Sequence, residues 1–410
     1  MNTTRFILAI LLSCLLCLGI AGCGGETASD EVARGTTVEV PTQATPSTGA
    51  APEGSTTQGA SSYESLFRGN LARTGEYSGP GPTGSPEVAW QFKIDGEQPK
   101  TPTVSDGMVY FGGGGKLWAV DADGGYQKWT FQAEGTVASC PAVAGGMVYF
   151  GSFDGSLYAL DAANGQEKWK FETGDFVVSS PAVANGVVYF GSLDGSVYAL
   201  DAESGEQQWS FQTGAEILPS PAISDGIVYI GGYDGYLRAL DAETGDERWN
   251  FKTDGTIWYT PAVSDGTVYF SNQLGPQCWL FSLDAKRGTT NWYFIEENAR
   301  FSAPTVVNGM VYFASQDYCL YALDTMNGEE QWRFTSERFV ESPNGHYSSP
   351  AASDGVVYFG SGDGYFYGIS ATDGQEDWSL KVGDGVSSSP AVVDGKVYFG
   401  SRDRLLYALE

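Results

Sequence analysis

Residues 177–213 read VVSSPAVANGVVYFGSLDGSVYALDAESGEQQWSFQT, and they hold one complete unit of a repeat that runs through most of the chain. Pro181 opens a short apolar segment, an Asn-Gly pair turns the chain, and VVYF forms a second segment. A Ser-x-Asp-Gly turn leads to VYALD, and a further turn through Gly205 leads to a last segment around Trp209. Four short strands joined by tight turns form one antiparallel sheet, and regular repetition of such a sheet is typical of a β-propeller blade.

The number of units predicts the number of blades. The last unit stops at Glu410 without a tryptophan, whereas Trp90 precedes the first opening proline by the twelve residues that separate Trp129 from Pro141. Residues 88–92 are therefore expected to complete the blade that the C-terminus begins, which removes an open sheet edge. The sequence predicts an all-β, eight-bladed propeller of four-stranded antiparallel blades over residues 87–410. The opening prolines are Pro102, Pro141, Pro181, Pro221, Pro261, Pro304, Pro350 and Pro390.

Three segments precede the propeller. Residues 1–23 are expected to be a lipoprotein signal peptide, because Arg5 is followed by an apolar stretch too short for a membrane span. That stretch ends in LGIAGC, which resembles a bacterial lipobox with lipidation at Cys23; an ordinary secretory signal cleaved near Ala21 or Gly22 is the alternative. Residues 24–61 are rich in Thr, Ser, Gly and Pro and are predicted to be a disordered tether. Residues 62–86 form a polar lead-in segment.

The charge balance limits the partners that the propeller can bind. The chain carries 22 basic and 50 acidic residues, a formal net charge of −28. Nucleic-acid binding needs a cationic footprint, which the sequence does not contain, so nucleic acid is excluded as a partner. The same acidity disfavours adsorption of the folded domain to anionic lipid, so contact with a membrane is expected through the lipid anchor only.

Two short motifs and the repeat itself resemble a known family. The lead-in segment contains Phe67-Arg68-Gly69-Asn70 and Ala72-Arg73-Thr74-Gly75, and the repeats combine Ser-Pro-Ala, Val-Tyr-Phe-Gly-Ser and Tyr-Ala-Leu-Asp-Ala. Residues 63–410 thereby resemble the PQQ-like propeller superfamily. That superfamily includes quinoprotein dehydrogenases and also BamB-type lipoproteins of outer-membrane assembly. The resemblance implies the fold directly and leaves both functions open.

The motifs that could carry chemistry are better explained by structure. Ala199, Asp201, Gly205 and Trp209 match a motif of the quinoprotein dehydrogenases, in which the turn caps a hairpin and the tryptophan wedges between blades. The repeated Ser-x-Asp-Gly is expected to form hairpin turns rather than a ring of functional carboxylates. The adjacent cysteine pair and the calcium site of the family's alcohol dehydrogenases have no counterpart in the sequence. We therefore expect no catalytic, cofactor-binding or metal-binding residue and no bound cofactor.

Three cysteines belong to the propeller, namely Cys140, Cys278 and Cys319. Cys278 and Cys319 occupy nearly equivalent positions in consecutive blades. A disulfide between them suits an oxidising compartment, and two free thiols are the alternative.

The repeat is irregular in one sector. The opening prolines are separated by 39, 40, 40, 40, 43, 46 and 40 residues, and the longer spacings come from insertions within residues 272–278 and 335–348. Aromatic and basic residues gather there, whereas equivalent connections elsewhere carry acids such as Glu134, Asp175 and Glu216. Such a composition is typical of an interface hot spot, with neutral loop variation as the alternative. The candidate partner-binding residues are Trp258, Tyr259, Gln273, Arg300, Phe301, Arg338, Phe339, His346 and Tyr347.

Together these features predict a non-catalytic lipoprotein scaffold of the cell envelope. We expect a monomeric, BamB-like propeller that binds a protein partner. We expect a lipid anchor to hold this propeller at the periplasmic face of the outer membrane or at the cell surface. The alternative is a quinoprotein-type dehydrogenase or sensor that binds PQQ or another small ligand.

Overall fold

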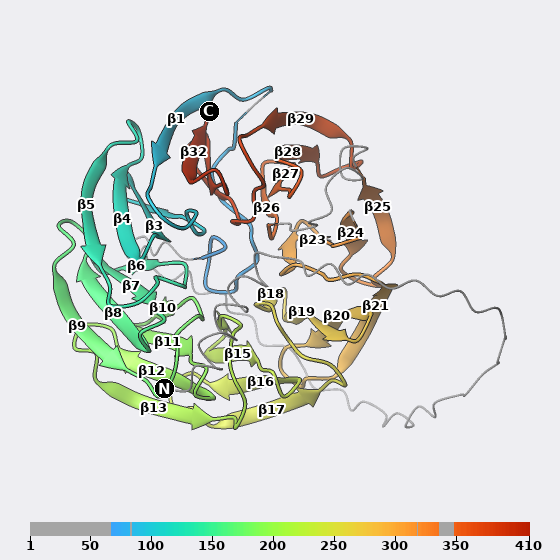
Figure 1. The fold of residues 1–410 in the computed structure, drawn as a ribbon. Helices are drawn as coiled ribbons and strands as arrows, with labels where there is room; N and C mark the ends of the chain where they lie inside the picture. The colour runs from blue at the N-terminus through green and yellow to red at the C-terminus, as the bar shows by residue number, and fades with distance from the viewer. Residues whose placement is uncertain (1–66, 83, 318, 336–347) are drawn as a thin grey trace, which may run out of the picture.

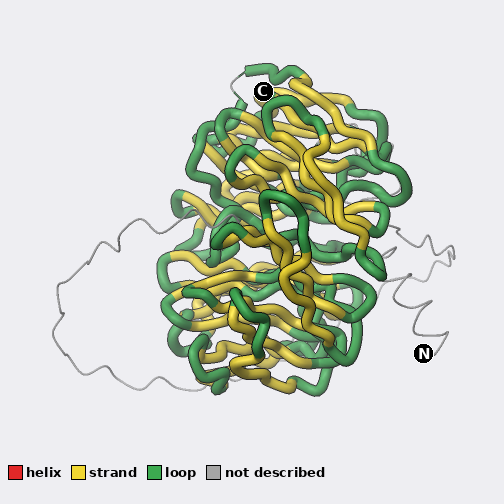
Figure 2. Tube along the Cα trace, turned by 90° about the vertical axis from the view of Figure 1, so that its left-hand side faces the viewer, coloured by secondary structure: helices red, strands yellow, loops and turns green. Residues whose placement is uncertain are grey.

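The structure, a computed structural model, describes residues 67–82, 84–317, 319–335 and 348–410. Every regular element in these residues is a β-strand. Figure 1 shows the strands arranged as a ring, and Figure 2 shows the same ring from the side, built from strands and turns. Within this part of the chain, no helix has the length and hydropathy that a membrane span requires. The all-β prediction is confirmed.

The strands form eight sheets of four strands each, so the eight-bladed propeller is confirmed. Blades 1 to 7 follow the chain, with the first strand of each next to the axis and the fourth on the rim (Figure 1). The strands are, for blade 1, β2 (Thr103–Ser105), β3 (Met108–Gly113), β4 (Lys116–Asp121) and β5 (Gln127–Gln132); for blade 2, β6 (Ala142–Ala144), β7 (Met147–Gly151), β8 (Ser156–Asp161) and β9 (Glu167–Glu172); for blade 3, β10 (Ala182–Ala184), β11 (Val187–Gly191), β12 (Ser196–Asp201) and β13 (Gln207–Gln212); for blade 4, β14 (Ala222–Ser224), β15 (Ile227–Gly231), β16 (Tyr236–Asp241) and β17 (Glu247–Lys252); for blade 5, β18 (Ala262–Ser264), β19 (Thr267–Leu274), β20 (Gln277–Asp284) and β21 (Thr290–Glu297); for blade 6, β22 (Thr305–Val307), β23 (Met310–Ala314), β24 (Leu320–Asp324) and β25 (Glu330–Phe334); for blade 7, β26 (Ala351–Ser353), β27 (Val356–Gly360), β28 (Tyr365–Ser370) and β29 (Glu376–Lys381); and for blade 8, β30 (Ala391–Val393), β31 (Lys396–Gly400), β32 (Leu405–Leu409) and β1 (Val88–Lys93).

Blade 8 joins the two ends of the propeller. Its sheet order is β1-β32-β31-β30, and β1 pairs antiparallel with β32 so that Trp90 lies opposite Ala408. Beyond the strands, Glu87 and Glu410 exchange two backbone hydrogen bonds of 3.0 and 3.1 Å. Figure 1 shows β1, in blue, beside β32, in red. Ring closure by the N-terminal strand is therefore confirmed.

Contacts between blades depend on the repeated tryptophan. The indole N–H of Trp209 donates to Ala242 O of the next blade at 3.0 Å, and the hydroxyl of Tyr189 donates to the same oxygen at 3.0 Å. The indole ring lies against Gly245, where a Cβ atom would come within 2.7 Å of Trp209 Cδ2. The predicted wedge between blades is thus confirmed. The same donation to the next blade is made by Trp90, Trp129, Trp169, Trp209, Trp249, Trp292 and Trp332.

The ring has two different faces. Consecutive antiparallel strands place the connections between second and third strands on the same face as the connections between blades; we call it the loop face. The remaining turns lie on the opposite face, the turn face. A backbone bridge between Val137 and Ser152 joins the two kinds of connection on the loop face. Close to the axis, residues that precede opening prolines link neighbouring blades, as where Ser180 N–H donates to Ser220 Oγ at 2.9 Å and Ser220 N–H donates to Thr260 Oγ1 at 3.2 Å.

Candidate functional site

The lead-in segment fills the centre of the ring. The backbone carbonyls of Leu71, Ala72 and Thr74 accept hydrogen bonds from the innermost strands of three successive blades. The donors are the amides of Ile223, Val263 and Val306, at 2.8, 2.8 and 2.7 Å. Figure 1 shows this segment, in blue, in the middle of the ring. The chain therefore closes most of its own axis with backbone that pairs with the surrounding blades, and a pocket of 650 Å³ remains between this segment and the first strands of blades 1 and 8.

Arg73 places a guanidinium group within this closed centre. Its side chain is fully buried, and it donates to the carbonyl oxygens of Phe67 at 2.5 Å, Pro181 at 2.8 Å and Pro221 at 3.0 Å. Burial lowers the pKa of Arg73 to about 9, which leaves the group protonated at neutral pH. A buried charge is tolerated where hydrogen bonds replace its hydration, and Arg73 meets that condition through carbonyl dipoles.

Arg68 binds the same segment to the start of blade 6. Its Nε donates to Arg73 O at 3.1 Å, and one Nη donates to Thr305 Oγ1 at 2.8 Å and to Pro304 O. Burial lowers its pKa to about 10. Gly69 allows the tight turn between the two arginines, because its φ is +83° and a Cβ would lie 2.4 Å from a backbone oxygen. The two short motifs of the lead-in segment, residues 67–70 and 72–75, thus lie in the centre of the ring, and we call this part of the chain the plug. The sequence did not predict this role for them.

The repeated aspartates of the loop face are committed to turns. In blade 2, Asp154 accepts the Ser156 amide at 2.9 Å and the Tyr158 hydroxyl at 2.9 Å. Asp194 repeats this pattern in blade 3, accepting the amide of Ser196 at 2.8 Å and the hydroxyl of Tyr198 at 2.7 Å. The predicted turn role of Ser-x-Asp-Gly is therefore confirmed.

Several candidate partner-binding residues come together beside blade 5. Trp258 and Tyr259 lie in the connection from blade 4 and are half-buried, while Arg300, in the connection to blade 6, is exposed. Burial raises the pKa of Tyr259, and the nearby charge of Arg300 opposes the shift. Gln273 joins the two connections: its backbone exchanges hydrogen bonds of 2.9 and 3.0 Å with Thr256, and its side-chain amide donates to Ala299 O at 3.5 Å.

Phe301 does not belong to this surface, and the prediction that it contacts a partner needs correction. Its side chain is 0 % exposed and packs against Phe294, Phe313 and Tyr321 with ring centroids 6.1, 4.5 and 6.2 Å away. It fills the buried position that Ile257 fills in the preceding connection. Ile257 stands four residues before its proline and Phe301 only three, and the composition of the sector, on which the prediction rested, does not show this difference.

Five residues with predicted roles lie outside the part of the chain that the structure describes. They are Arg338, Phe339, His346, Tyr347 and Cys23, and their roles stay predictions.

The cysteines of the propeller do not form a disulfide. Cys278 and Cys319 are free thiols, so the second of the two alternatives for this pair holds. Among the residues described, no three His, Cys, Asp or Glu side chains are grouped so that they could hold a metal ion.

Tyr233 was missed by the sequence reading. Its ring lies 4.7 Å from that of Trp258, and its hydroxyl oxygen is buried without a hydrogen-bond partner in the described structure. Burial and the neighbouring Glu216 raise its pKa. Together with Asp175, Asp194 and Glu216 it lines a loop-face pocket of 690 Å³. A signal was present in the sequence, because Phe153 and Tyr233 both place an aromatic residue directly before the Asp-Gly of the turn.

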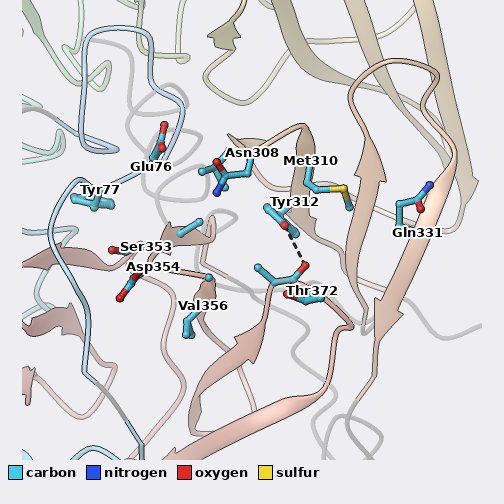
Figure 3. Close-up of a pocket in the computed structure, with 14 residues that line it drawn as sticks. Glu76, Tyr77, Asn308, Met310, Tyr312, Gln331, Ser353, Asp354, Val356 and Thr372 are labelled. Atoms are coloured by element: carbon cyan, nitrogen blue, oxygen red, sulfur yellow. Dashed lines mark hydrogen bonds between the residues drawn. The ribbon is translucent and has the colours of Figure 1, made fainter.

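A smaller pocket of 370 Å³ lies on the turn face where the plug leaves the axis (Figure 3). Glu76 and Tyr77 of the lead-in segment line it with Asn308 of blade 6 and Asp354 of blade 7. The hydroxyl of Tyr312, at its wall, donates to Ala371 O at 3.3 Å, drawn as a dashed line in Figure 3. This pocket thus forms part of the seam between plug and blades.

Comparison with known proteins identifies the family. The family model described as "Outer membrane protein assembly factor BamB" matches residues 83–140, 134–333 and 320–410. The chain belongs to this BamB family. Its sequence matches no curated protein. The resemblance to a PQQ-like propeller, drawn from the motifs, is confirmed.

Solved structures extend the likeness in fold to enzymes. BamB from Moraxella catarrhalis is 21% identical, with a TM-score of 0.65 over 79% of this chain and 97% of that chain. A quinohemoprotein alcohol dehydrogenase from Comamonas testosteroni is 16% identical, with a TM-score of 0.68 over 84% of this chain and 80% of that chain. A europium-containing methanol dehydrogenase is 13% identical, with a TM-score of 0.69 over 84% and 97%. At these identities the structures share the fold, and the fold occurs both in BamB and in dehydrogenases.

Proposed function

We propose that this protein is a non-catalytic scaffold of the cell envelope that binds a protein partner. The observation that carries the proposal is the closed axis. A small ligand held at the axis would need the space that residues 67–82 and the Arg73 guanidinium fill. Displacing the plug would leave the carbonyls of Ser180, Pro181 and Pro221 without their donor, which costs free energy.

The proposed contact surface is the loop face around the connections to and from blade 5. Trp258, Tyr259 and Arg300 supply the aromatic and guanidinium groups that dominate protein interfaces, and Gln273 holds the two connections together. The predicted residues Arg338, Phe339, His346 and Tyr347 would extend this surface. Membership in the BamB family supports a protein-binding role.

The proposed location is the periplasmic face of the outer membrane or the cell surface. In this scheme Cys23 carries the lipid, and residues 24–61 form a tether with a reach of roughly 35 Å. The measurement is metabolic labelling with an alkyne fatty acid, comparing the full chain with Cys23→Ser. Loss of the label and of membrane association in the variant is expected. Cleavage before residue 23 without lipid would favour an ordinary secretory signal.

Quinone binding distinguishes the scaffold from the alternative of a dehydrogenase. The purified full chain is incubated with PQQ and CaCl₂, freed of unbound quinone by gel filtration, and examined by absorbance. We expect no stoichiometric quinone and no dye reduction on adding primary alcohols or sugars. One quinone retained per chain, together with dye reduction, would overturn the proposal in favour of a dehydrogenase.

The loop-face surface is tested by a matched pair of variants. Trp258→Ala combined with Arg300→Ala should abolish in-cell cross-linking to the envelope partner that the wild-type chain captures. Arg287→Ala is the control, because Arg287 is also exposed but pairs with Asp284 in a turn-face hairpin. Equal cross-linking by wild type and both variants would contradict this surface.

A further inference from the structure

Blade 5 exposes large hydrophobic side chains, two on its rim and one at its loop-face hairpin. Tyr293 and Ile295 of β21 are 56% and 36% exposed, and Leu274, at the end of β19, is 41% exposed. Blade 5 alone thus supplies three of the six large hydrophobic residues that the described part of the chain exposes. Burying such side chains is favourable, so a cluster of them on a rim indicates a surface that another molecule covers.

Comparison between blades shows how unusual this rim is. Tyr293 and Ile295 stand one and three residues after the repeated tryptophan of their strand. In the other seven blades both positions are polar: Gln91 and Lys93, Thr130 and Gln132, Lys170 and Glu172, Ser210 and Gln212, Asn250 and Lys252, Arg333 and Thr335, Ser379 and Lys381. Polar and charged residues on an outer strand protect its edge from unwanted pairing. Blade 5 lacks that protection at these two positions.

Tyr293 and Ile295 belong to one continuous apolar face of the sheet. In the register of β20 with β21, Phe281 lies opposite Tyr293 and Trp279 opposite Ile295. The Trp279 ring is 5.2 Å from Tyr293 and stacks at 5.8 Å on Phe281, whose ring contacts Phe251 of blade 4 at 5.5 Å. The face therefore begins at the packed core between blades 4 and 5 and continues outward onto the rim.

The backbone of β21 is also prepared for pairing. The strand has eight residues, whereas the outer strands of the other blades have five or six. In the sheet order β18-β19-β20-β21 it is paired with β20 only, so its outer edge faces away from the sheet. Such an edge offers unpaired N–H and C=O groups to an added strand, while side-chain contacts on one face give selectivity.

Charge indicates which strand would be added. β21 ends in Glu296 and Glu297, and the chain has a formal net charge of −28. A cationic segment would be attracted to this edge, and a second copy of the acidic chain would be repelled. We propose that β21 is a docking edge for an extended, cationic segment of a partner protein, which pairs with its backbone and packs apolar side chains on Tyr293 and Ile295. The proposal rests on the proposed scaffold function and specifies the form of its ligand.

The test uses the full chain and a defined probe. The probe is a fluorescein-labelled peptide of nine residues in which Val alternates with Lys and Thr, and its binding is followed by fluorescence anisotropy. One variant carries Tyr293→Ser and Ile295→Gln, the residues that blade 3 uses at these positions. The control variant carries Ser210→Ala and Gln212→Ala at the matched positions of β13. Because blade 3 accommodates Ser and Gln at these places, the double variant is expected to fold.

The expected result is saturable binding to the wild type and to the β13 control. The β21 variant should bind about tenfold more weakly or worse, the effect of removing an interface anchor. A peptide with two central prolines should not bind, because proline cannot donate to the added ladder. Hydrogen exchange should show that the probe protects the amides of β21 and leaves those of β13 unchanged.

Other outcomes would overturn the proposal. No saturable binding to the wild type, or equal binding to the β21 variant, would refute docking at β21. Equal affinity for a peptide with Glu in place of Lys would refute the cationic ligand. A dimer seen by light scattering and lost in the β21 variant would make a second copy the occupant. Quinone retention, by contrast, bears on the scaffold function alone, so the two failures are distinguishable.

Discussion

Replacing Arg73 tests whether the lead-in segment is held in the axis by its guanidinium group. Arg73→Met removes three donors from the buried carbonyls of Phe67, Pro181 and Pro221 and keeps an apolar stem of similar width. Each charge-assisted hydrogen bond contributes about 1.5–3 kcal/mol. The variant also avoids burying a charge, which offsets part of the loss. Each buried carbonyl that loses its donor costs about 1–3 kcal/mol, and with that offset we expect a loss of about 3–5 kcal/mol for docking of the plug.

Amide exchange reports this loss where it occurs. Ile223, Val263 and Val306 donate their amide protons to the plug, so these protons exchange with solvent when the plug opens. A loss of about 3–5 kcal/mol corresponds to exchange about 150- to 5,000-fold faster, as long as closing is faster than exchange. Amides within the blades, such as those of β11, should exchange at their wild-type rates.

Arg248→Met serves as the control for losing an arginine. Arg248 is exposed and pairs with Asp241 in a surface turn, so its removal should cost at most about 1 kcal/mol and leave the three reporter amides unchanged. Unchanged exchange in Arg73→Met would refute the reasoning, because the plug would then be held by its backbone bonds alone. Equal acceleration in both variants would show a general loosening of the propeller.

Two further perturbations test the blades themselves. Gly205→Ala should destabilise by about 2–4 kcal/mol, because the added Cβ lies 2.7 Å from Trp169 Cδ2 at a φ of +74°. The control is Gly226→Ala: Gly226 has a similar φ of +69°, but an added Cβ would meet no atom within 4 Å, so this variant should lose only about 1 kcal/mol of stability. Equal urea midpoints for the two variants would refute the role of the tryptophan wedge. Hydrogen bonds from Arg248 and the turn amides hold the pKa of Asp241 at about 2, below its ordinary value of 3.8. The ionised Asp241 therefore stabilises the fold fully above pH 3.8, and this stabilisation disappears as the pH falls through about 2. The small difference in melting temperature between wild type and Asp241→Asn should therefore narrow on acidification, and a constant difference would contradict this assignment.

The sequence was sufficient for the architecture because a propeller repeats its local rules. Each blade shows its turns and its tryptophan at fixed distances, so the eight blades can be counted without knowing any contact. Even ring closure could be predicted from local spacing. Trp90 precedes Pro102 by the twelve residues that separate the tryptophan of one blade from the opening proline of the next, as in Trp129 and Pro141. Local chemistry and global fold agree at these positions, which makes them predictable.

Long-range contacts are the part that periodicity could not supply. Arg73 donates to Pro181 and Pro221, residues more than a hundred positions away, and the lead-in segment has no repeat against which to align it. The polar, irregular sequence of that segment indicated only that it is not a blade strand, whereas residues 71–74 pair with the innermost strands at the centre of the ring. Phe301 shows a different limit. It stands three residues before Pro304, whereas the equivalent buried residue Ile257 stands four residues before Pro261, so the repeat does not reveal that Phe301 lies in the core.

The asymmetry of blade 5 follows from combining these observations. A ring of eight nearly identical blades offers eight nearly identical rims, and its axis is closed by the plug, so selective recognition must come from the sector that departs from the repeat. Blade 5 departs in three places: an extended β19–β20 hairpin, an eight-residue outer strand, and apolar side chains where the other blades are polar. Neutral drift in loops explains the insertion alone. It does not explain why a longer exposed edge also carries Tyr293 and Ile295, since a longer edge without polar protection favours aggregation. A surface that is covered in use removes this conflict, because the same two residues then stabilise a complex.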